Sequence, residues 1–291
     1  MSLVKLADPG DLVEPIAVAA FDGWVDSGSA STTAAERLAE GASIVATFDA
    51  DRLFDYRARR PTLRIIDGRP TELDWPELTM RRTRVGERDV LILTGPEPDY
   101  CWHELADDVV ELATHFGVVE WISLGAIPAA VPHTRPVPII GTASQRGLLR
   151  GKVEAGPAGT LQVPAAVVSV LDMAITGAGI AALGYFAQVP HYISGRYPAA
   201  ALDLLRAVGR HLDEAIPEGS LADEAAQLRT RLDAAALLDE QTRTYVERLE
   251  AMVDEARLPS GDELISDIER FLRDRGTGRS SNSGGGTGLP N

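Results

Sequence analysis

Two apolar stretches of the sequence are each followed by Val-Pro-His, and this repeat is its most specific chemical feature. The repeats place His133 after residues 118–124 and His191 after residues 180–189. Histidine has an ordinary pKa close to neutral pH, so either imidazole could act as a general base. Arg135 carries a planar guanidinium that suits a phosphate or a carboxylate. In a second, structural interpretation the imidazoles bond backbone carbonyls and close their loops.

Further polar and aromatic residues follow the other apolar stretches. Asp22 and Asp26 could be paired carboxylates or metal ligands, although Asp26 also suits the start of a helix, where a carboxylate accepts backbone N–H bonds. Trp24 is either a contact residue exposed on a loop or a lid over the core. The candidate binding residues are Asp22, Trp24, Asp26, Glu97, His133, Thr134, Arg135, His191 and Tyr192.

Sequence patterns of common enzyme classes are missing. The sequence contains no Gly-x-Ser-x-Gly elbow, no Gly-x-x-x-x-Gly-Lys phosphate loop, and no Cys or His cluster at metal-ligand spacing. We therefore assign no catalytic residue and expect neither a metal nor a cofactor. The remaining enzyme hypothesis is a phosphorylase or hydrolase acting on a small nucleoside-like or amide substrate, with a histidine as base and Arg135 as anion clamp.

The candidate residues depend on the elements that must position them. Short apolar stretches alternate with amphipathic segments of helix length, which is typical of βαβ units around a mostly parallel sheet. Loops at the carboxyl ends of such strands gather at one edge, so we expect the candidates to share a rim. Strands are expected over Pro15–Phe21, Ser43–Phe48, Asp89–Leu93, Val118–Leu124, Val137–Gly141 and Ile180–Val189. Helices are expected over Ser27–Glu40, Tyr100–Phe116, Val163–Thr176 and Pro198–Leu212.

The strand over Pro15–Phe21, the helix over Ser27–Glu40 and the strand over Ser43–Phe48 predict a βαβ unit. An antiparallel excursion interrupts the pattern after this unit. Leu63–Ile66 and Leu78–Val85 are short and arginine-rich, and Gly68-Arg69-Pro70 separates them. Turn residues between two such segments favour antiparallel strands with one wet face.

The chain becomes wholly helical after residue 212. Residues 213–275 hold 17 acidic and 8 basic side chains, as a solvated helical layer would. We predict an α/β core with flanking helices over 1–214, an acidic helical extension packed on it over 215–275, and a disordered Gly- and Ser-rich tail over 276–291. Residues 220–257 form a helical hairpin or one long helix, and a final helix follows over Asp262–Arg275.

Composition excludes several classes of partner. The net charge of −15 argues against nucleic acid, which requires clustered Lys and Arg. Glycines interrupt the longest uncharged run, Met173–Pro190, so no membrane span is expected. The single Cys101 cannot form an internal disulfide, and the first residues lack the pattern of a secretion signal. We therefore expect a cytoplasmic protein.

The run Leu124-Gly-Ala-Ile-Pro-Ala-Ala-Val-Pro-His-Thr-Arg-Pro-Val-Pro138 resembles the hallmark of the proteasome assembly chaperone family, in its actinobacterial branch. Other segments are similar to the family pattern in the same order, so the resemblance spans residues 15–275. These segments include Phe21–Asp26, Phe54–Pro61, Trp75-Pro76, Gly95–Pro98, Val189–Tyr192, Tyr245–Glu250 and Ile268–Leu272.

This resemblance implies an α/β core related to nucleoside phosphorylases and hydrolases, together with self-association. In eukaryotic and archaeal relatives it also implies a role in assembling rings of proteasome α-subunits. Our functional hypothesis is a protein-binding, assembly chaperone-like homo-oligomer that assists the assembly of the proteasome or of another oligomer, with proteasome α-subunits as the candidate partner. The alternative is the enzyme described above.

Overall fold

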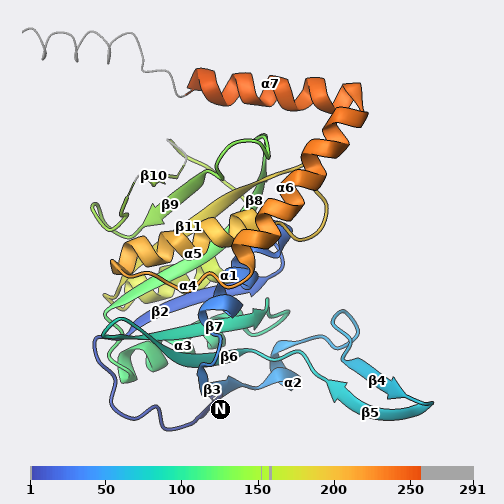
Figure 1. Ribbon diagram of the computed structural model, residues 1–291. Coiled ribbons are helices and arrows are strands. Elements are labelled where there is room, and N and C mark those ends of the chain that lie inside the picture. The colour runs from blue at the N-terminus through green and yellow to red at the C-terminus, as the bar shows by residue number, and fades with distance from the viewer. Residues whose placement is uncertain (1, 152, 157–158, 257–291) are drawn as a thin grey trace, which may run out of the picture.

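The computed structural model describes residues 2–151, 153–156 and 159–256 (Figure 1). The expected final helix over Asp262–Arg275 and the expected tail over 276–291 lie outside these residues.

A nine-stranded sheet forms the centre of the described chain, in the order β1-β3-β6-β7-β2-β8-β11-β9-β10. Its four central strands, β7, β2, β8 and β11, are parallel, whereas β9 and the pairings among β1, β3, β6 and β7 are antiparallel. The predicted α/β architecture with a mostly parallel sheet is therefore confirmed. The strands are β1 Val4–Leu6, β2 Ile16–Asp22, β3 Ser43–Phe48, β6 Thr79–Val85, β7 Arg88–Pro96, β8 Glu120–Ala129, β9 Ile139–Ala143, β10 Glu154–Ala155 and β11 Ala181–Pro190.

Burial explains which strands take the centre. Residues 16–21 of β2 and 89–94 of β7 are buried throughout, as a strand covered on both faces must be. The first residues of β3, Ser43 and Ile44, are exposed, which suits a flank of the sheet. β6 and β7 accordingly lie between β2 and β3. The expectation that β2 and β3 are neighbouring strands of a βαβ unit is therefore wrong.

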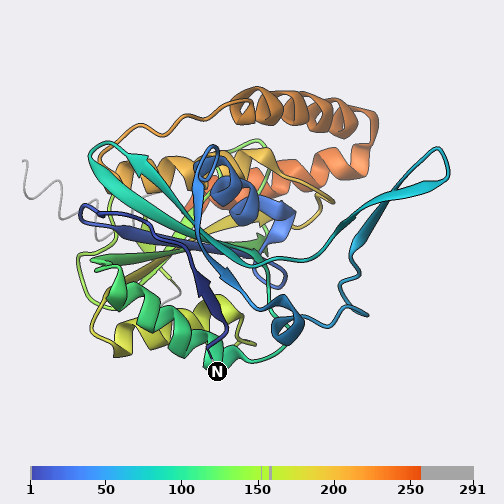
Figure 2. The ribbon, with the colours of Figure 1, turned by 90° about the horizontal axis from the view of Figure 1, so that it is seen from below.

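Helices cover both faces of the sheet (Figure 2). α3 (Trp102–His115) and α4 (Val167–Gly177) contribute to one apolar layer, and α1 (Ala30–Leu38) and α5 (Pro198–Leu212) to the other. The expected helix over Ser27–Glu40 is divided, because Gly28 and Ser29 have positive φ angles of 68° and 49°. A short 3-10 turn, η1 (Ser27–Ser29), therefore precedes α1.

The C-terminal segment forms two helices that meet at Asp239. α6 (Leu221–Leu238) packs on α5, and α7 (Glu240–Ala256) then turns away from α6 (Figure 1). Asp239 has extended backbone angles, and its carboxylate accepts a hydrogen bond from the Thr242 N–H at 3.0 Å. This break excludes one long helix.

A two-stranded arm projects from the body between β3 and β6, after the short helix α2 (Ala50–Leu53) (Figures 1 and 2). It consists of β4 (Thr62–Ile66) and β5 (Arg69–Asp74), which pair with each other alone. The expected pairing of Leu63–Ile66 with Leu78–Val85 is wrong, because the turn at Asp67 and Gly68 leads directly into β5.

One carboxyl group lies between the sheet and α4. Asp172 Oδ1 accepts hydrogen bonds from Trp121 Nε1 at 3.0 Å and from Ser123 Oγ at 2.5 Å. Burial raises the pKa of Asp172 to about 7, against the lowering effect of these two bonds.

Replacing Asp172 with Asn should remove a pH dependence of stability. The raised pKa means that the unfolded chain loses its proton first as pH rises, so the wild type loses stability between the ordinary value of 3.8 and about 7. Relative to wild type, the free energy of unfolding of Asp172→Asn should therefore increase by on the order of 4 kcal/mol between about pH 4 and pH 8. Urea unfolding at a series of pH values measures this difference.

Asp107→Asn, at an exposed position of α3, is the matched control and should follow the wild type at every pH. If the free energy of unfolding changed with pH in the same way for the wild type and Asp172→Asn, this result would contradict the raised pKa of Asp172.

Candidate functional site

The four central strands end at the same edge of the sheet because they are parallel. Asp22 ends β2, and Glu97 follows β7 directly. His133 follows β8 after a short loop, and His191 follows β11 directly. The contacts made by the nine candidate residues divide this rim into separate parts.

Asp22, Trp24 and Glu97 occupy the part of the rim above β2 and β7. Asp22 pairs with Arg59 at 2.8 Å, and its backbone carbonyl accepts the Glu97 N–H at 3.0 Å. The Glu97 carboxylate accepts the backbone N–H of Val167 at 2.7 Å, at the first residue of α4. The Trp24 side chain contributes little to these contacts and is 65% exposed, so it is a surface residue and not a lid.

Asp26 serves the start of α1. Its carboxylate accepts bonds from the Ser31 N–H at 2.7 Å, the Ser31 hydroxyl at 2.6 Å and the Thr32 hydroxyl at 2.5 Å. Asp26 is buried, and Ser31 is fully buried. This is the arrangement of a carboxylate at a helix start, and it occupies the oxygens that a metal would need.

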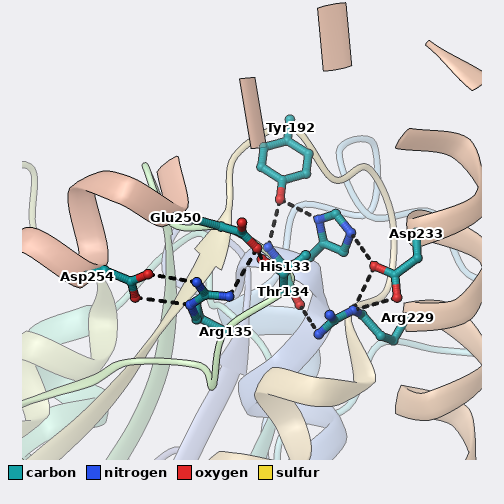
Figure 3. Close-up of polar contacts among 8 residues, drawn as sticks. All are labelled: His133, Thr134, Arg135, Tyr192, Arg229, Asp233, Glu250 and Asp254. Atoms are coloured by element: carbon teal, nitrogen blue, oxygen red, sulfur yellow. Dashed lines mark hydrogen bonds and ion pairs between the residues drawn. The ribbon is translucent and has the colours of Figure 1, made fainter. Parts of the chain in front are cut away.

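His133 is buried, and it lies in a chain of hydrogen bonds that joins the loop after β8 to α6 (Figure 3). Its Nε2 lies 3.2 Å from Asp233 Oδ1, and its Nδ1 lies 2.7 Å from the Tyr192 hydroxyl. Arg229 donates from Nε to the Asp233 carboxylate at 2.9 Å and from Nη1 to the His133 carbonyl at 3.0 Å. The loop is thus bound through both its side chain and its backbone.

The charge state of His133 follows from its surroundings. Burial lowers the pKa of His133, and nearby Arg229 lowers it further, whereas Asp233 opposes the shift. The imidazole is therefore neutral at pH 7, and the network assigns its proton to Nε2, which donates to Asp233. The Tyr192 hydroxyl donates to Nδ1, while its oxygen accepts the backbone N–H of His133 at 2.7 Å.

Arg135 and Thr134 bind α7 in the same way (Figure 3). The Arg135 guanidinium contacts both carboxylate oxygens of Asp254, at 3.1 and 2.8 Å, and Glu250 at 3.1 Å. The Thr134 hydroxyl donates to the Glu250 carboxylate. The hydrogen bond with Asp254 raises the pKa of Arg135, which is therefore a permanent cation held by two carboxylates.

His191 contacts the same helix from the end of β11. Its Nδ1 lies 2.9 Å from the Ala129 carbonyl, and its Nε2 lies 3.0 Å from the Tyr245 hydroxyl on α7. The rings of Tyr192 and Tyr245 meet edge to face, with centroids 6.0 Å apart. We name the contacts of His133, Thr134, Arg135, His191 and Tyr192 with α6 and α7 the rim clasp.

The rim clasp borders a cavity of about 370 Å³ between the His133 loop and helices α5 and α6. Both ring nitrogens of His133 and of His191 are engaged, so neither histidine is poised as a base. In the described part of the chain, no cluster of three His, Cys, Asp or Glu residues is arranged to hold a metal. Within the same residues, no helix is long and apolar enough to cross a membrane.

The sequence interpretation missed the helical half of the rim clasp. Arg229 and Asp233 are four residues apart on α6, a spacing that also fits an ordinary exposed helix pair. Tyr245 and Glu250 are the first and last residues of one of the segments that resemble the family pattern, and this resemblance was the available signal. No sequence signal pointed to Asp254.

The model of the PAC2 family matches residues 20–236. The chain belongs to the PAC2 family. This match runs along the chain from the end of β2 to near the end of α6, so it includes every strand of the central sheet except β1 and the first part of β2. It confirms the resemblance to proteasome assembly chaperones. No curated protein matches the chain.

Several solved structures share this PAC2 fold. A Corynebacterium glutamicum protein of unknown function is 29% identical, with a TM-score of 0.81 over 87% of this chain and 97% of its own. A Mycobacterium tuberculosis proteasome-assembly chaperone homologue is 32% identical, with a TM-score of 0.72 over 79% and 99%. A PAC2 family protein from Streptomyces avermitilis is 33% identical, with a TM-score of 0.71 over 80% and 99%. These neighbours agree with the expected actinobacterial branch.

Replacing Arg135 with Lys should loosen α7 while leaving the PAC2 core folded. Lysine keeps the charge but cannot bond both oxygens of Asp254 together with Glu250. We expect about a fivefold faster amide hydrogen exchange across α7, with no change in α5. Exchange followed by mass spectrometry measures this effect. Arg243→Lys is the control, because the ion pairs of Arg243 on α7 are 3.9 Å long. Equal exchange in the two variants would argue against the clasp.

Replacing Asp26 with Ala should destabilise the whole core. The change removes the acceptor at the start of α1 and leaves the buried Ser31 hydroxyl without its partner, so we expect a loss of about 2 kcal/mol. Asp22→Ala, whose carboxylate is half exposed, should cost less than about 1 kcal/mol. Thermal and urea unfolding compare the two variants, and a smaller loss for Asp26→Ala than for Asp22→Ala would refute the assigned role.

Proposed function

We propose that this PAC2 chain is a protein-binding assembly chaperone that associates with itself and with proteasome α-subunits in the cytoplasm. Membership of the PAC2 family supports a chaperone-like role, and one relative above 30% identity is a proteasome-assembly chaperone homologue. The acidic composition favours protein partners over nucleic acid. The single cysteine suits a reducing compartment.

The observation that carries the proposal is the set of large apolar side chains left exposed on elements that project from a closed core. Trp24 at the rim is 65% exposed, Trp75 at the base of the arm is 46% exposed, and Leu238 at the end of α6 is 90% exposed. Aromatic and aliphatic residues of this kind anchor protein interfaces because their burial supplies most of the binding free energy.

A phosphorylase or hydrolase is the second candidate. The cavity beside His133 and Arg135 favours it, because a small polar substrate would find a cation and an imidazole there. Such an enzyme needs a histidine with an available ring nitrogen and an unpaired anion clamp. In the rim clasp both histidines have partners at both nitrogens, and Arg135 is bound by two carboxylates. Protein binding is therefore the better supported function.

The purified chain should form a complex with α-subunits of an actinobacterial proteasome. Size-exclusion chromatography with light scattering detects the complex, and biolayer interferometry gives its dissociation constant, which we expect to be micromolar or tighter. Trp24→Ala should weaken binding about tenfold, because an exposed tryptophan is a typical interface anchor. Met173→Ala on α4, where Met173 is 78% exposed, is the control and should bind normally. A wild-type chain that ignores α-subunits at high micromolar concentration would remove this partner from the proposal.

A further inference from the structure

Another cavity lies at the edge of the sheet opposite the rim clasp. It has a volume of about 370 Å³ and lies between α4 and the strands β9 and β11. Ala182 and Leu183, near the start of β11, border it, so it lies at the amino ends of the parallel strands, whereas the rim clasp lies at their carboxyl ends. A cavity of this size accommodates a small molecule or a single side chain. We name it the α4 cavity.

The walls of the α4 cavity suit a short apolar chain that carries one polar end. Ala143, Met173 and Leu183 contribute apolar surface, and Thr142 and Ser144 contribute hydroxyl groups. The Ser144 Oγ accepts a backbone N–H at 3.1 Å, and a hydroxyl oxygen can accept a second hydrogen bond. Both hydroxyls are therefore available to a donor in the cavity.

Asp172 on α4 brings a carboxyl group to the same cavity. Its Oδ1 accepts the hydrogen bonds from Trp121 and Ser123 described above. Its Oδ2 has no hydrogen-bond partner among the described residues, and this oxygen is not sealed from solvent. Oδ2 is therefore the atom of this carboxyl group that a ligand can reach.

This carboxyl group lacks a countercharge. Within the part of the chain that the structure describes, none of the residues lining the cavity is Lys, Arg or His. Burial raises the pKa of Asp172, and no neighbouring charge contributes to the shift. Asp89 differs in this respect, since its buried carboxylate pairs with Arg82 at 2.8 Å. A carboxylate held away from water without such a partner is costly to ionise, and a cationic ligand would offset that cost.

We propose that the α4 cavity binds the ammonium group of an aliphatic primary amine, which donates hydrogen bonds to Asp172 Oδ2 and to the hydroxyls of Thr142 and Ser144. An ammonium has three N–H donors, so these oxygens match it in number. Its alkyl chain lies against Met173 and Leu183. A free alkylamine and the side chain of a lysine both carry this chemistry. The inference goes beyond the proposed function and does not depend on it.

The binding of an amine should depend on pH, because Asp172 must lose its proton to pair with an ammonium. A pKa of about 7 leaves this group about 90% ionised at pH 8 and about 1% ionised at pH 5. An alkylamine, like lysine, has a pKa of about 10 and stays protonated over this range. Affinity should therefore be about a hundredfold weaker at pH 5 than at pH 8.

NMR titration of the full chain with n-butylamine tests the proposal. Trp121 is the reporter, since its indole N–H bonds the other oxygen of the Asp172 carboxyl group. The chain has four tryptophans, and Trp121→Phe identifies the indole signal of Trp121. At pH 8 this signal should shift with a dissociation constant in the millimolar range or tighter. The signal of Trp24, at the opposite edge of the sheet, should stay in place.

Two related probes and two variants separate charge from shape. n-Butanol has the same chain without the charge, and n-butyrate has the opposite charge, so each should bind at least about tenfold more weakly than n-butylamine. Asp172→Asn should weaken n-butylamine binding at least about tenfold and remove its pH dependence. Asp107→Asn, at an exposed position of α3, is the matched control and should bind like the wild type. Thermal unfolding shows that each variant is folded.

A further probe distinguishes the two sources of the amine. Nα-acetyl-lysine methylamide presents the same ammonium group from a lysine side chain. An affinity equal to or tighter than that of n-butylamine would identify a lysine of a polypeptide as the ligand, and a weaker affinity would identify a free alkylamine.

The inference would be overturned by any of the following results: no shift of the Trp121 signal with n-butylamine, equal affinities for n-butylamine and n-butanol, normal binding by Asp172→Asn, or equal affinities at low and high pH. The pH comparison uses the wild type alone, so it decides the case even if a variant fails to fold. These titrations contain no α-subunit. The amine site and the proteasome partner can therefore fail independently.

Discussion

The polar contacts between the loop after β8 and helices α6 and α7 are the interaction on which the arrangement of this molecule depends. Arg135 binds Asp254 through two parallel hydrogen bonds, and His133 bonds Asp233 from a position that is 4% exposed. These groups stand where an α/β enzyme of open-sheet type would bind its ligand. Because helical carboxylates occupy them, the edge of the sheet holds an accessory layer of the same chain in place.

This arrangement separates the protein into a rigid support and displayed surfaces. The parallel strands and the two apolar layers of helices provide the support, with residues such as Ile92 and Trp121 fully buried. The β4–β5 arm and the junction of α6 and α7 extend from it, on elements where apolar side chains remain in water. The closed polar networks and the exposed apolar side chains of these elements thus lie in different places, which agrees with the proposed protein-binding function.

Local sequence patterns identified the central strands because burial on both faces produces continuous apolar stretches, as in Val90–Leu93. The order of the strands was less accessible, since the insertion of β6 and β7 between β2 and β3 depends on pairing between distant segments. The candidate residues were located at strand ends by the same logic. Their partners were missed because Arg229 and Asp233 are indistinguishable from an exposed helix pair until the His133 loop is placed beside them.

The separation in sequence between the two halves of the rim clasp also affects biosynthesis. Arg135 leaves the ribosome well before Asp254, which lies 119 residues later. At ordinary translation rates, on the order of ten seconds pass between the synthesis of Arg135 and that of Asp254. During that interval the nascent core presents the Arg135 guanidinium without its carboxylate partners, and the carboxylates of α7 neutralise it once that helix has been made.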